Sequence, residues 1–382
     1  MGLKNDSQSS SGVNVQAIER DLRNLWEQMA EATQVEGREP VMRACVLNLI
    51  VYAPGERTAG EVNQIMAEVT TQHPSRVFVM LPKYEAAEPA LSAWVTAQCH
   101  LSAGGHKQVC CEQIMITAED GAIYRLPSLV RPLLVPDLPV VLWWRDSLSF
   151  ASRLFDELLE TADRVIIDTA ALPDPLEGLA RLAALIRQQA RWTAFSDLSW
   201  ARLTPWRGLV AGFFDVPDYR PYLMRLNRVE IKCGKDREDH DLIPVQALQV
   251  IGWLASRLRW QPRSRLQWTD TQACQLELTV DNQPILIQIK TSPSTDDTPA
   301  GLHVIRLSTE RKPSARFVVS RSGDGLHLQS SVELAGMKLI GKVARLNGHS
   351  EAQLISKELE ILSHDTVYGQ ALEFVSGLKI KD

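Results

Sequence analysis

The stretch Leu134-Val-Pro-Asp-Leu-Pro-Val-Val-Leu-Trp-Trp-Arg-Asp146 has at its centre five consecutive apolar residues, Val140 to Trp144, that favour β-structure. Short unbroken apolar runs are typical of strands covered on both faces, as in a parallel sheet. The prolines before the run lack a backbone donor, so the strand begins after them. A helix over residues 149–159 and a second buried strand over 164–168 complete a strand-helix-strand unit. Ligands and partners of such sheets bind beyond the strand C-termini, where Trp144, Arg145 and Asp146 are expected.

The chain before this unit also alternates strands and helices. Apolar spacing predicts helices over 14–33 and 58–72 and strands over 43–52 and 76–81. Two strand-like runs, 91–101 and 107–117, flank Ser102-Ala-Gly-Gly-His106, which is a hairpin signal. With a final helix over 176–192, we expect an α/β domain in residues 13–192, a mixed sheet with helices on its faces. Residues 1–12 are polar and Ser-rich, and we expect a disordered tail there.

The second half of the chain has a different rhythm. A helix over 204–214, a strand over 228–233 and a long helix over 242–260 precede short β-runs with turn residues between them. Two helical stretches, 350–362 and 365–378, close the chain. We therefore expect an α+β domain in residues 193–382 with an antiparallel sheet. The predicted β-runs are 264–269, 273–280, 285–291, 303–307, 316–320 and 326–331.

Composition indicates an ordinary globular protein. The 382 residues are 45% hydrophobic and 23% charged, with a formal net charge of -5. That charge argues against nucleic acid and anionic membrane surfaces as partners, and no apolar run approaches the roughly 20 residues that span a bilayer. Six Cys in a chain of this length do not form a disulfide scaffold, so a reducing cytoplasm is the expected location.

Catalytic motifs are missing from the sequence. It contains no Gly-x-Gly-x-x-Gly, no phosphate loop ending in Gly-Lys-Ser/Thr, no Gly-x-Ser-x-Gly and no His-Glu-x-x-His. The eight His are scattered, and none has a second ligand at metal-binding spacing along the chain, apart from Cys99-His100, whose side chains face opposite ways on a strand. We therefore expect no catalytic residues, no cofactor and no metal.

Tryptophan and arginine occur together in two motifs. Trp and Arg dominate the energetics of many protein interfaces, so these motifs are candidates for a partner surface. The alternative is that the tryptophans simply pack in the core. The interface candidates are Trp143, Trp144, Arg145 and Asp146 in the first motif and Trp200, Arg202, Trp206 and Arg207 in the second.

Three segments resemble a known family. Leu138-Pro-Val-Val-Leu-Trp-Trp-Arg145, Gly105-His-Lys-Gln-Val-Cys-Cys-Glu-Gln-Ile114 and Asp197-Leu-Ser-Trp-Ala-Arg-Leu-Thr-Pro-Trp-Arg207 are similar to motifs of the bacterial glucose-6-phosphate dehydrogenase assembly protein (OpcA) family. The resemblance implies a non-catalytic assembly factor that binds glucose-6-phosphate dehydrogenase, promotes its active oligomer and acts as an allosteric activator. It would support NADPH production by the oxidative pentose phosphate pathway. In photosynthetic members the resemblance also implies redox control through thioredoxin.

Two other functions stay open on the sequence. One is an enzyme that binds a sugar phosphate or nucleotide, with Arg145, Arg202 and Arg207 as anion ligands. The other is a structural scaffold for a different complex.

The cysteines near the predicted hairpin are redox candidates: Cys99, Cys110 and Cys111. If Gly104-Gly105 forms a two-residue turn, Cys99 lies directly opposite Cys110, with Cα atoms about 4.5 to 5.5 Å apart. That distance suits a disulfide. If the loop is longer, the register slips by one residue and the two sulfurs face opposite sides of the sheet. Neighbouring Cys110 and Cys111 point apart on a strand, so a bond between them is not expected.

Overall fold

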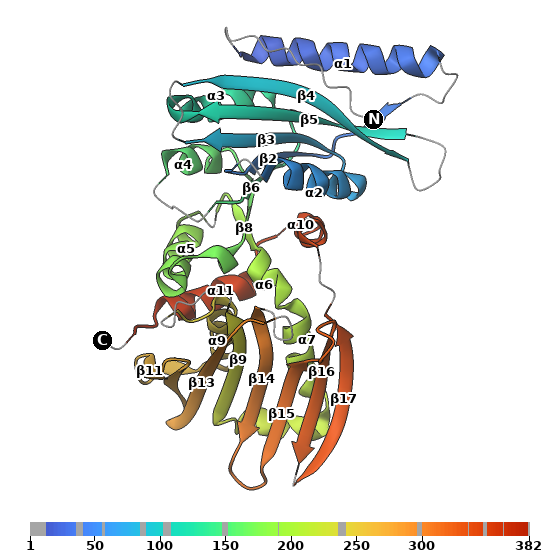
Figure 1. Cartoon of the computed structure of the whole chain (residues 1–382). Coiled ribbons are helices and arrows are strands. Elements are labelled where there is room, and N and C mark those ends of the chain that lie inside the picture. Colours follow the sequence, from blue (N-terminus) through green and yellow to red (C-terminus); the bar gives the residue numbers. More distant parts are fainter. Residues whose placement is uncertain are drawn as a thin grey trace. The chain divides into compact units, whose positions relative to one another are not determined.

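The computed structural model of this chain describes residues 13–35, 41–55, 58–84, 89–101, 108–146, 152–189, 191–235, 242–295, 300–334, 336–346, 350–361 and 363–380 (Figure 1). Two compact units divide it. Unit 1 takes in residues 1–168, 189–196 and 350–364, and unit 2 takes in 169–188, 197–349 and 365–382. The chain thus enters each unit several times, whereas the sequence analysis expected one boundary between residues 192 and 193. The expected tail, 1–12, lies outside the described residues.

Unit 1 is built on an eight-stranded sheet with the order β1-β5-β3-β2-β6-β7-β8, and β4 pairs with β5. The pairs from β1 to β7 along this order are parallel, and β4 runs antiparallel to β5. The predicted mixed α/β sheet is therefore largely parallel. The strands are β1 (Met42–Arg43), β2 (Leu47–Tyr52), β3 (Ser75–Lys83), β4 (Leu91–Leu101), β5 (Gln108–Glu119), β6 (Val140–Trp144), β7 (Arg164–Ile167) and β8 (Ala194–Asp197).

Strand β2 occupies the middle of this sheet. Chain order runs outward from it, through β3 and β5 on one side and β6, β7 and β8 on the other. This is the strand order of dinucleotide-binding domains, whose ligands lie where the order reverses, between the first and fourth strands of the fold. Here that point lies between β2 and β6. All residues of both strands are buried, as expected for a sheet covered on its two faces.

Helices of unit 1 are held to the sheet by apolar packing and by one buried carboxylate. Glu112 of β5 is ion-paired with Arg43 and Arg76, each at 2.6 Å, and accepts a 2.5 Å hydrogen bond from Trp26 Nε1. Because Trp26 belongs to α1, this cluster anchors that helix, which lies along β4 in Figure 1. The helices are α1 (Val15–Val35), α2 (Thr58–Gln72), α3 (Leu126–Val130), α4 (Arg153–Leu159) and α10 (Glu351–Leu359).

Unit 2 contains a nine-stranded sheet with the order β10-β12-β13-β9-β14-β15-β16-β17, and β11 pairs with β12. The prediction of an antiparallel sheet was wrong at one position, because β13 pairs with β9 in parallel. Parallel neighbours need a long crossover, which the chain between β9 and β13 provides. The strands are β9 (Arg228–Lys235), β10 (Gln261–Pro262), β11 (Gln267–Asp270), β12 (Ala273–Val280), β13 (Gln283–Pro293), β14 (Gly301–Thr309), β15 (Ala315–Arg321), β16 (His327–Leu334) and β17 (Met337–Arg345).

The helices of unit 2 cover one face of this sheet. The ring of Phe317 on β15 lies 5.4 Å from Phe213 and 5.1 Å from Phe214, at the end of α7. Figure 1 shows α7 and α9 on the same side of the sheet. The alternate residues point to the other side: on β9 they include Arg228, Glu230 and Lys232, and on β15 they are Arg316, Val318 and Ser320. The helices are α5 (Pro175–Gln189), α6 (Leu198–Arg202), α7 (Thr204–Phe213), α8 (Arg220–Leu223), α9 (Val245–Leu258) and α11 (Thr366–Ser376).

Helices α9 and α11 make an unusually close contact at Gly252. A Cβ atom at this position would lie 2.4 Å from the carbonyl oxygen of Ala371 and 2.8 Å from Val375 Cγ2. Only the absence of a side chain lets the two backbones approach this closely. Gly208, inside α7, has no atom within 4 Å of the corresponding position.

These two glycines give a matched test of the packing. Gly252→Ala should lower the free energy of unfolding by about 1 to 3 kcal/mol, because the helices must separate. Gly208→Ala should raise it by up to about 1 kcal/mol, because alanine is the better helix former. Urea unfolding of both variants measures the difference. Equal stabilities would contradict the described contact between α9 and α11.

Candidate functional site

Two aromatic rings fill the point where the strand order of unit 1 reverses. Tyr52 and Trp144 end β2 and β6 and are neighbours in the sheet register. Their rings stack with centroids 3.9 Å apart and an angle of 7° between planes, and Phe155 contacts Trp144 edge-on at 5.0 Å. Tyr52 is 1% exposed and Trp144 is 2% exposed. Burial and the 2.5 Å hydrogen bond between the Tyr52 and Tyr84 hydroxyls raise the pKa of Tyr52.

Arg145 closes the same end of the sheet. Its backbone N–H donates to the carbonyl of Tyr52 at 2.9 Å, which extends the pairing of β2 and β6 by one residue. Its guanidinium lies 3.2 Å from Glu351 and 3.9 Å from Glu61, and 4.9 Å from the centre of the Trp143 ring. Two carboxylates and an aromatic face therefore surround this cation, and its side chain is only 16% exposed.

This arrangement is unsuited to a dinucleotide. A bound pyrophosphate needs a glycine-rich turn after the first strand and an open crevice beside it. Here β2 is followed by Ala53-Pro54-Gly55, and the last residues of β2 and β6 are buried aromatic side chains stacked on each other. Arg145 faces carboxylates, which would repel a phosphate.

The second motif centres on a buried carboxylate. Asp197 is 1% exposed and caps α6 by accepting a hydrogen bond from the backbone of Ser199 at 2.9 Å. It also accepts bonds from the Thr169 hydroxyl at 2.6 Å, Gln249 Nε2 at 2.6 Å and the Tyr368 hydroxyl at 2.7 Å. The carboxylate thus joins four segments of unit 2 that are distant in sequence.

Trp200 and Arg207 continue this network. Trp200 Nε1 donates to Asp365 at 2.8 Å, and Asp365 in turn caps α11 by accepting from the backbone of Tyr368. The guanidinium of Arg207 lies 3.5 Å from the centre of the Trp200 ring and donates to the Trp200 carbonyl at 3.3 Å. The motif therefore joins α6 and α7 to the start of α11.

The four tryptophans of the predicted partner surface are core residues. Trp143, Trp144, Trp200 and Trp206 are each 4% exposed or less. The alternative of plain packing describes them better, because burial leaves no ring area for a partner. Part of the predicted set keeps partial exposure: Arg145, Asp146, Arg202 and Arg207.

Cys99 and Cys110 lie directly opposite each other on β4 and β5, as the two-residue turn predicted. The alternative register, slipped by one residue, is wrong. Their Cα atoms are 4.1 Å apart and the sulfurs form a disulfide. The turn residues themselves, 102–107, lie outside the described part of the chain. Cys111 is a buried free thiol whose pKa is raised by burial, so it is a poor nucleophile.

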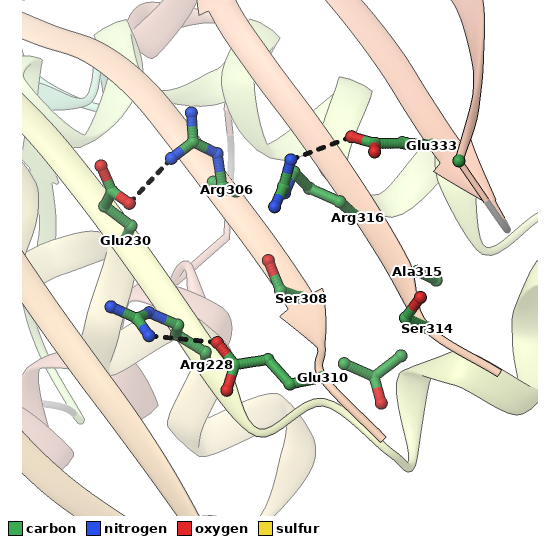
Figure 2. Close-up of a pocket in the computed structure, with 11 residues that line it drawn as sticks. Arg228, Glu230, Arg306, Ser308, Glu310, Ser314, Ala315, Arg316 and Glu333 are labelled. Atoms are coloured by element: carbon green, nitrogen blue, oxygen red, sulfur yellow. Dashed lines mark hydrogen bonds and ion pairs between the residues drawn. The ribbon is translucent and has the colours of Figure 1, made fainter. Parts of the chain in front are cut away.

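A pocket of about 320 Å³ lies on the helix-free face of the sheet in unit 2 (Figure 2). Three arginines from neighbouring strands line it, and each has a carboxylate partner. The pairs are Arg306 with Glu230 at 2.8 Å, Arg316 with Glu333 at 2.9 Å and Arg228 with Glu310 at 3.0 Å. In Figure 2 the Ser308 side chain lies between Arg228 and Arg316, and the register places it directly beside both.

This pocket was not predicted from the sequence. A signal existed, because Arg228, Glu230 and Lys232 alternate with apolar residues along the predicted strand. Alternation shows that a strand has a polar face. It cannot show that Arg306 and Arg316 come to lie beside them, since that depends on the order of strands in the sheet.

Comparisons with known proteins agree with the motifs. A family model described as glucose-6-phosphate dehydrogenase subunit N-terminal domain matches residues 66–184, and the corresponding C-terminal domain model matches 193–372. The chain belongs to the OpcA family. The two matched ranges include both Trp–Arg motifs.

Cyanobacterial members of the OpcA family are similar along most of this chain. An OxPP cycle protein OpcA from Synechocystis is 27% identical over 330 residues, which is 85% of this chain and 66% of that protein. The Synechococcus elongatus OpcA is 27% identical over 315 residues, or 81% of this chain and 68% of that protein. The chain therefore spans about two thirds of the length of these relatives.

Solved structures give a weaker likeness. An oxidoreductase, yvaA from Bacillus subtilis, aligns with a TM-score of 0.46 and 7% identity over 86% of this chain and 94% of that one. A Clostridium difficile dehydrogenase, MviM, aligns with a TM-score of 0.43 and 10% identity over 86% and 96%. We draw no argument from scores this low.

The described residues also lack a metal-binding cluster and a membrane-spanning helix. Within the described ranges, no three His, Cys, Asp or Glu side chains gather where they could hold a metal ion. Among the described helices, none combines the length and apolar character needed to cross a bilayer.

The disulfide can be tested directly. After mild oxidation, peptide mapping should find Cys99 linked to Cys110, and the same linkage should still form in the Cys111→Ser variant. Because the bond closes a loop with a sequence separation of 11, its reduction should lower the free energy of unfolding by about 2 to 3 kcal/mol. A linkage to any other cysteine, or none, would contradict the register of β4 and β5.

Proposed function

We propose that this protein is a cytoplasmic, non-catalytic assembly factor and allosteric activator of glucose-6-phosphate dehydrogenase. The proposal is carried by OpcA family membership together with the side chains at the point where the strand order reverses. The fold has the strand order of a dinucleotide-binding domain, yet the strand ends at this point carry two stacked, buried rings, Tyr52 and Trp144, and an arginine, Arg145, that is paired with carboxylates. A protein of this kind acts through its surface. Its place would be in the oxidative pentose phosphate pathway, where it promotes the active oligomer of its partner and raises NADPH production.

The alternative of a sugar-phosphate or nucleotide enzyme has less support. It needs arginines with free charge, whereas Arg145 faces two carboxylates and Arg207 stacks on Trp200. An anion would have to displace these contacts before it could bind.

Activation places one physical demand on the complex. The assembly factor must bind the active state of the dehydrogenase more tightly than the inactive state, because equal affinity for both shifts nothing. A tenfold shift needs only about 1.4 kcal/mol of differential affinity. One or two contacts made only in the active form supply that amount.

Redox control is the finer part of the proposal. The Cys99–Cys110 bond joins two strands beside each other, and Cys99 is partly exposed. A dithiol reductant such as thioredoxin would reach Cys99 first, because Cys110 is fully buried. Opening the bond would release β4 from β5 at the hairpin end.

Activity measurements test the central claim. The purified protein alone should give no turnover of glucose 6-phosphate with NADP. Added to the dehydrogenase at limiting glucose 6-phosphate, it should raise the rate in proportion to the complex formed. Bovine serum albumin at the same concentration controls for non-specific protection of the enzyme. An unchanged rate at every ratio of the two proteins would remove the proposal.

A second experiment asks whether the partly exposed Arg202 contacts the partner or only packs within the fold. If Arg202 contacts the dehydrogenase, Arg202→Ala should weaken binding by about 1 to 4 kcal/mol while the melting temperature stays unchanged. If Arg202 only supports the fold, the melting temperature should fall by several degrees and binding should stay normal. Calorimetric melting and a binding titration on the same preparation decide between the two.

A further inference from the structure

The helix-free face of the nine-stranded sheet, which we call the open face, has an ordered arrangement of charge. Across neighbouring strands the register places Arg228, Ser308, Arg316 and Glu333 in one row, and Glu230, Arg306 and Val318 in the next. Each arginine is oriented by a carboxylate, so its side chain is already ordered before any partner arrives. Pre-ordered arginines lose less entropy on binding than mobile lysines, which is one reason that Arg is enriched at interfaces.

Positive charge is in excess on the open face. Glu230 is 8% exposed because three cations surround it: Arg306 at 2.8 Å, Lys232 at 3.6 Å and Lys290 at 3.9 Å. These cations lower its pKa despite its burial. Among the residues that form ion pairs around the pocket, five cations meet three carboxylates, although the whole chain has a net charge of -5. The cations are Arg228, Lys232, Lys290, Arg306 and Arg316, and the carboxylates are Glu230, Glu310 and Glu333.

The pocket on this face suits a protruding side chain. Small-molecule sites are mostly apolar and enclose their ligand. This pocket of about 320 Å³ is lined mainly by charged and hydroxyl side chains and opens on the flat side of a sheet. The buried Nε atom of Arg306 has no hydrogen-bond partner among the described residues. A carboxylate from outside could accept from the more accessible guanidinium groups of Arg228 and Arg316, whose side chains are 36% and 52% exposed, and would add negative charge to the face.

The open face is also large enough for a stable complex. Seven neighbouring strands of the sheet contain seven to eleven residues each: β12, β13, β9, β14, β15, β16 and β17. At about 4.8 Å between strands and about 3.3 Å per residue, they cover about 900 Å². A standard protein interface takes about 800 Å² from each partner.

We propose that the open face is a docking surface for an acidic protein surface that inserts a carboxylate side chain between Arg228, Arg306 and Arg316. A second copy of this chain is a poor occupant, because it would place five cations against five. On the function proposed above, the occupant is the dehydrogenase, and the inference rests on that function in this respect. The ion pairs present before docking fix the positions of the arginines, and the partner carboxylate completes the charge balance.

Arg316 offers the sharpest test, because its side chain is 52% exposed and among the described residues its ion-pair partner is Glu333. The Arg316→Glu variant should bind the purified dehydrogenase at least tenfold more weakly in a titration. Binding of the unchanged protein should weaken as salt rises, and the variant should lose part of that dependence. The matched control is Arg257→Glu on α9, an exposed position on the covered side of the sheet, which makes the same change in net charge. It should bind within twofold of the unchanged protein.

A charge swap excludes a merely structural effect. The double variant Arg316→Glu and Glu333→Arg keeps an intramolecular ion pair, so its melting temperature should be close to normal. It moves the positive charge from β15 to β16, one strand further from Arg228 and Arg306, so its binding should stay weak. Restored binding in the swap would assign Arg316 a structural role and overturn the docking proposal.

The remaining outcomes separate this inference from the proposed function. If Arg316→Glu binds as tightly as the unchanged protein, the docking face is wrong while the assembly function stands. If the unchanged protein does not bind the dehydrogenase, the function fails and the proposed occupant fails with it. If light scattering finds a dimer that Arg316→Glu dissociates, the face belongs to a second copy and the proposal is overturned.

Discussion

The stacking of Tyr52 on Trp144 is the contact that joins the ends of the two central strands of unit 1. A parallel sheet in this strand order presents a crevice at the ends of its first and fourth strands. Two large rings in face-to-face contact at 3.9 Å fill that position, and Phe155 packs against them. Aromatic side chains bury more area than any others, so the contact also stabilises the two strands that carry it. The same feature therefore supports the fold at the end of the sheet where the strand order reverses.

Buried carboxylates organise the rest of each unit. Glu112 joins α1, β1 and β3 to β5 in unit 1, and Asp197 joins four segments in unit 2. A buried charge without partners is costly, so every group around it must be in place before the carboxylate is stable. Such networks specify one arrangement of the chain. The second Trp–Arg motif belongs to such a network, since Trp200 and Arg207 are connected to Asp197 through Asp365 and Tyr368.

The two sheets differ in how much of their surface other elements cover. The parallel sheet of unit 1 is covered, and its charged residues at the strand ends are paired within the unit. The open face of unit 2 instead presents charged side chains in register, with one face of the sheet left for solvent or a partner. Strand β17 at its edge has several exposed apolar residues, including Ile340 at 84% and Met337 at 71%. Exposed charged and apolar side chains of this kind are where a protein surface can contact a partner.

The sequence by itself determined most of the local structure. Helix α2 and strands β4, β6 and β12 begin and end where their patterns predicted, because apolar periodicity and turn residues act over a few residues. It also narrowed the hairpin to two registers, and the structure has the one that places Cys99 opposite Cys110. Strand β17 was missed because Gly341 interrupts its pattern and its apolar residues are exposed. The parallel pairing of β9 with β13 was missed because it depends on a crossover.

Only the tertiary structure decided that the tryptophans of the two motifs are buried in the core. From the sequence, Trp143, Trp144, Trp200 and Trp206 fitted an interface as well as a core. Their burial depends on residues brought in from distant segments, such as Tyr52, Phe155 and Tyr368. The pocket between Arg228, Arg306 and Arg316 likewise exists only because β9, β14 and β15 are neighbours. Strand order is set by the summed packing of the whole sheet, and no local pattern encodes that sum.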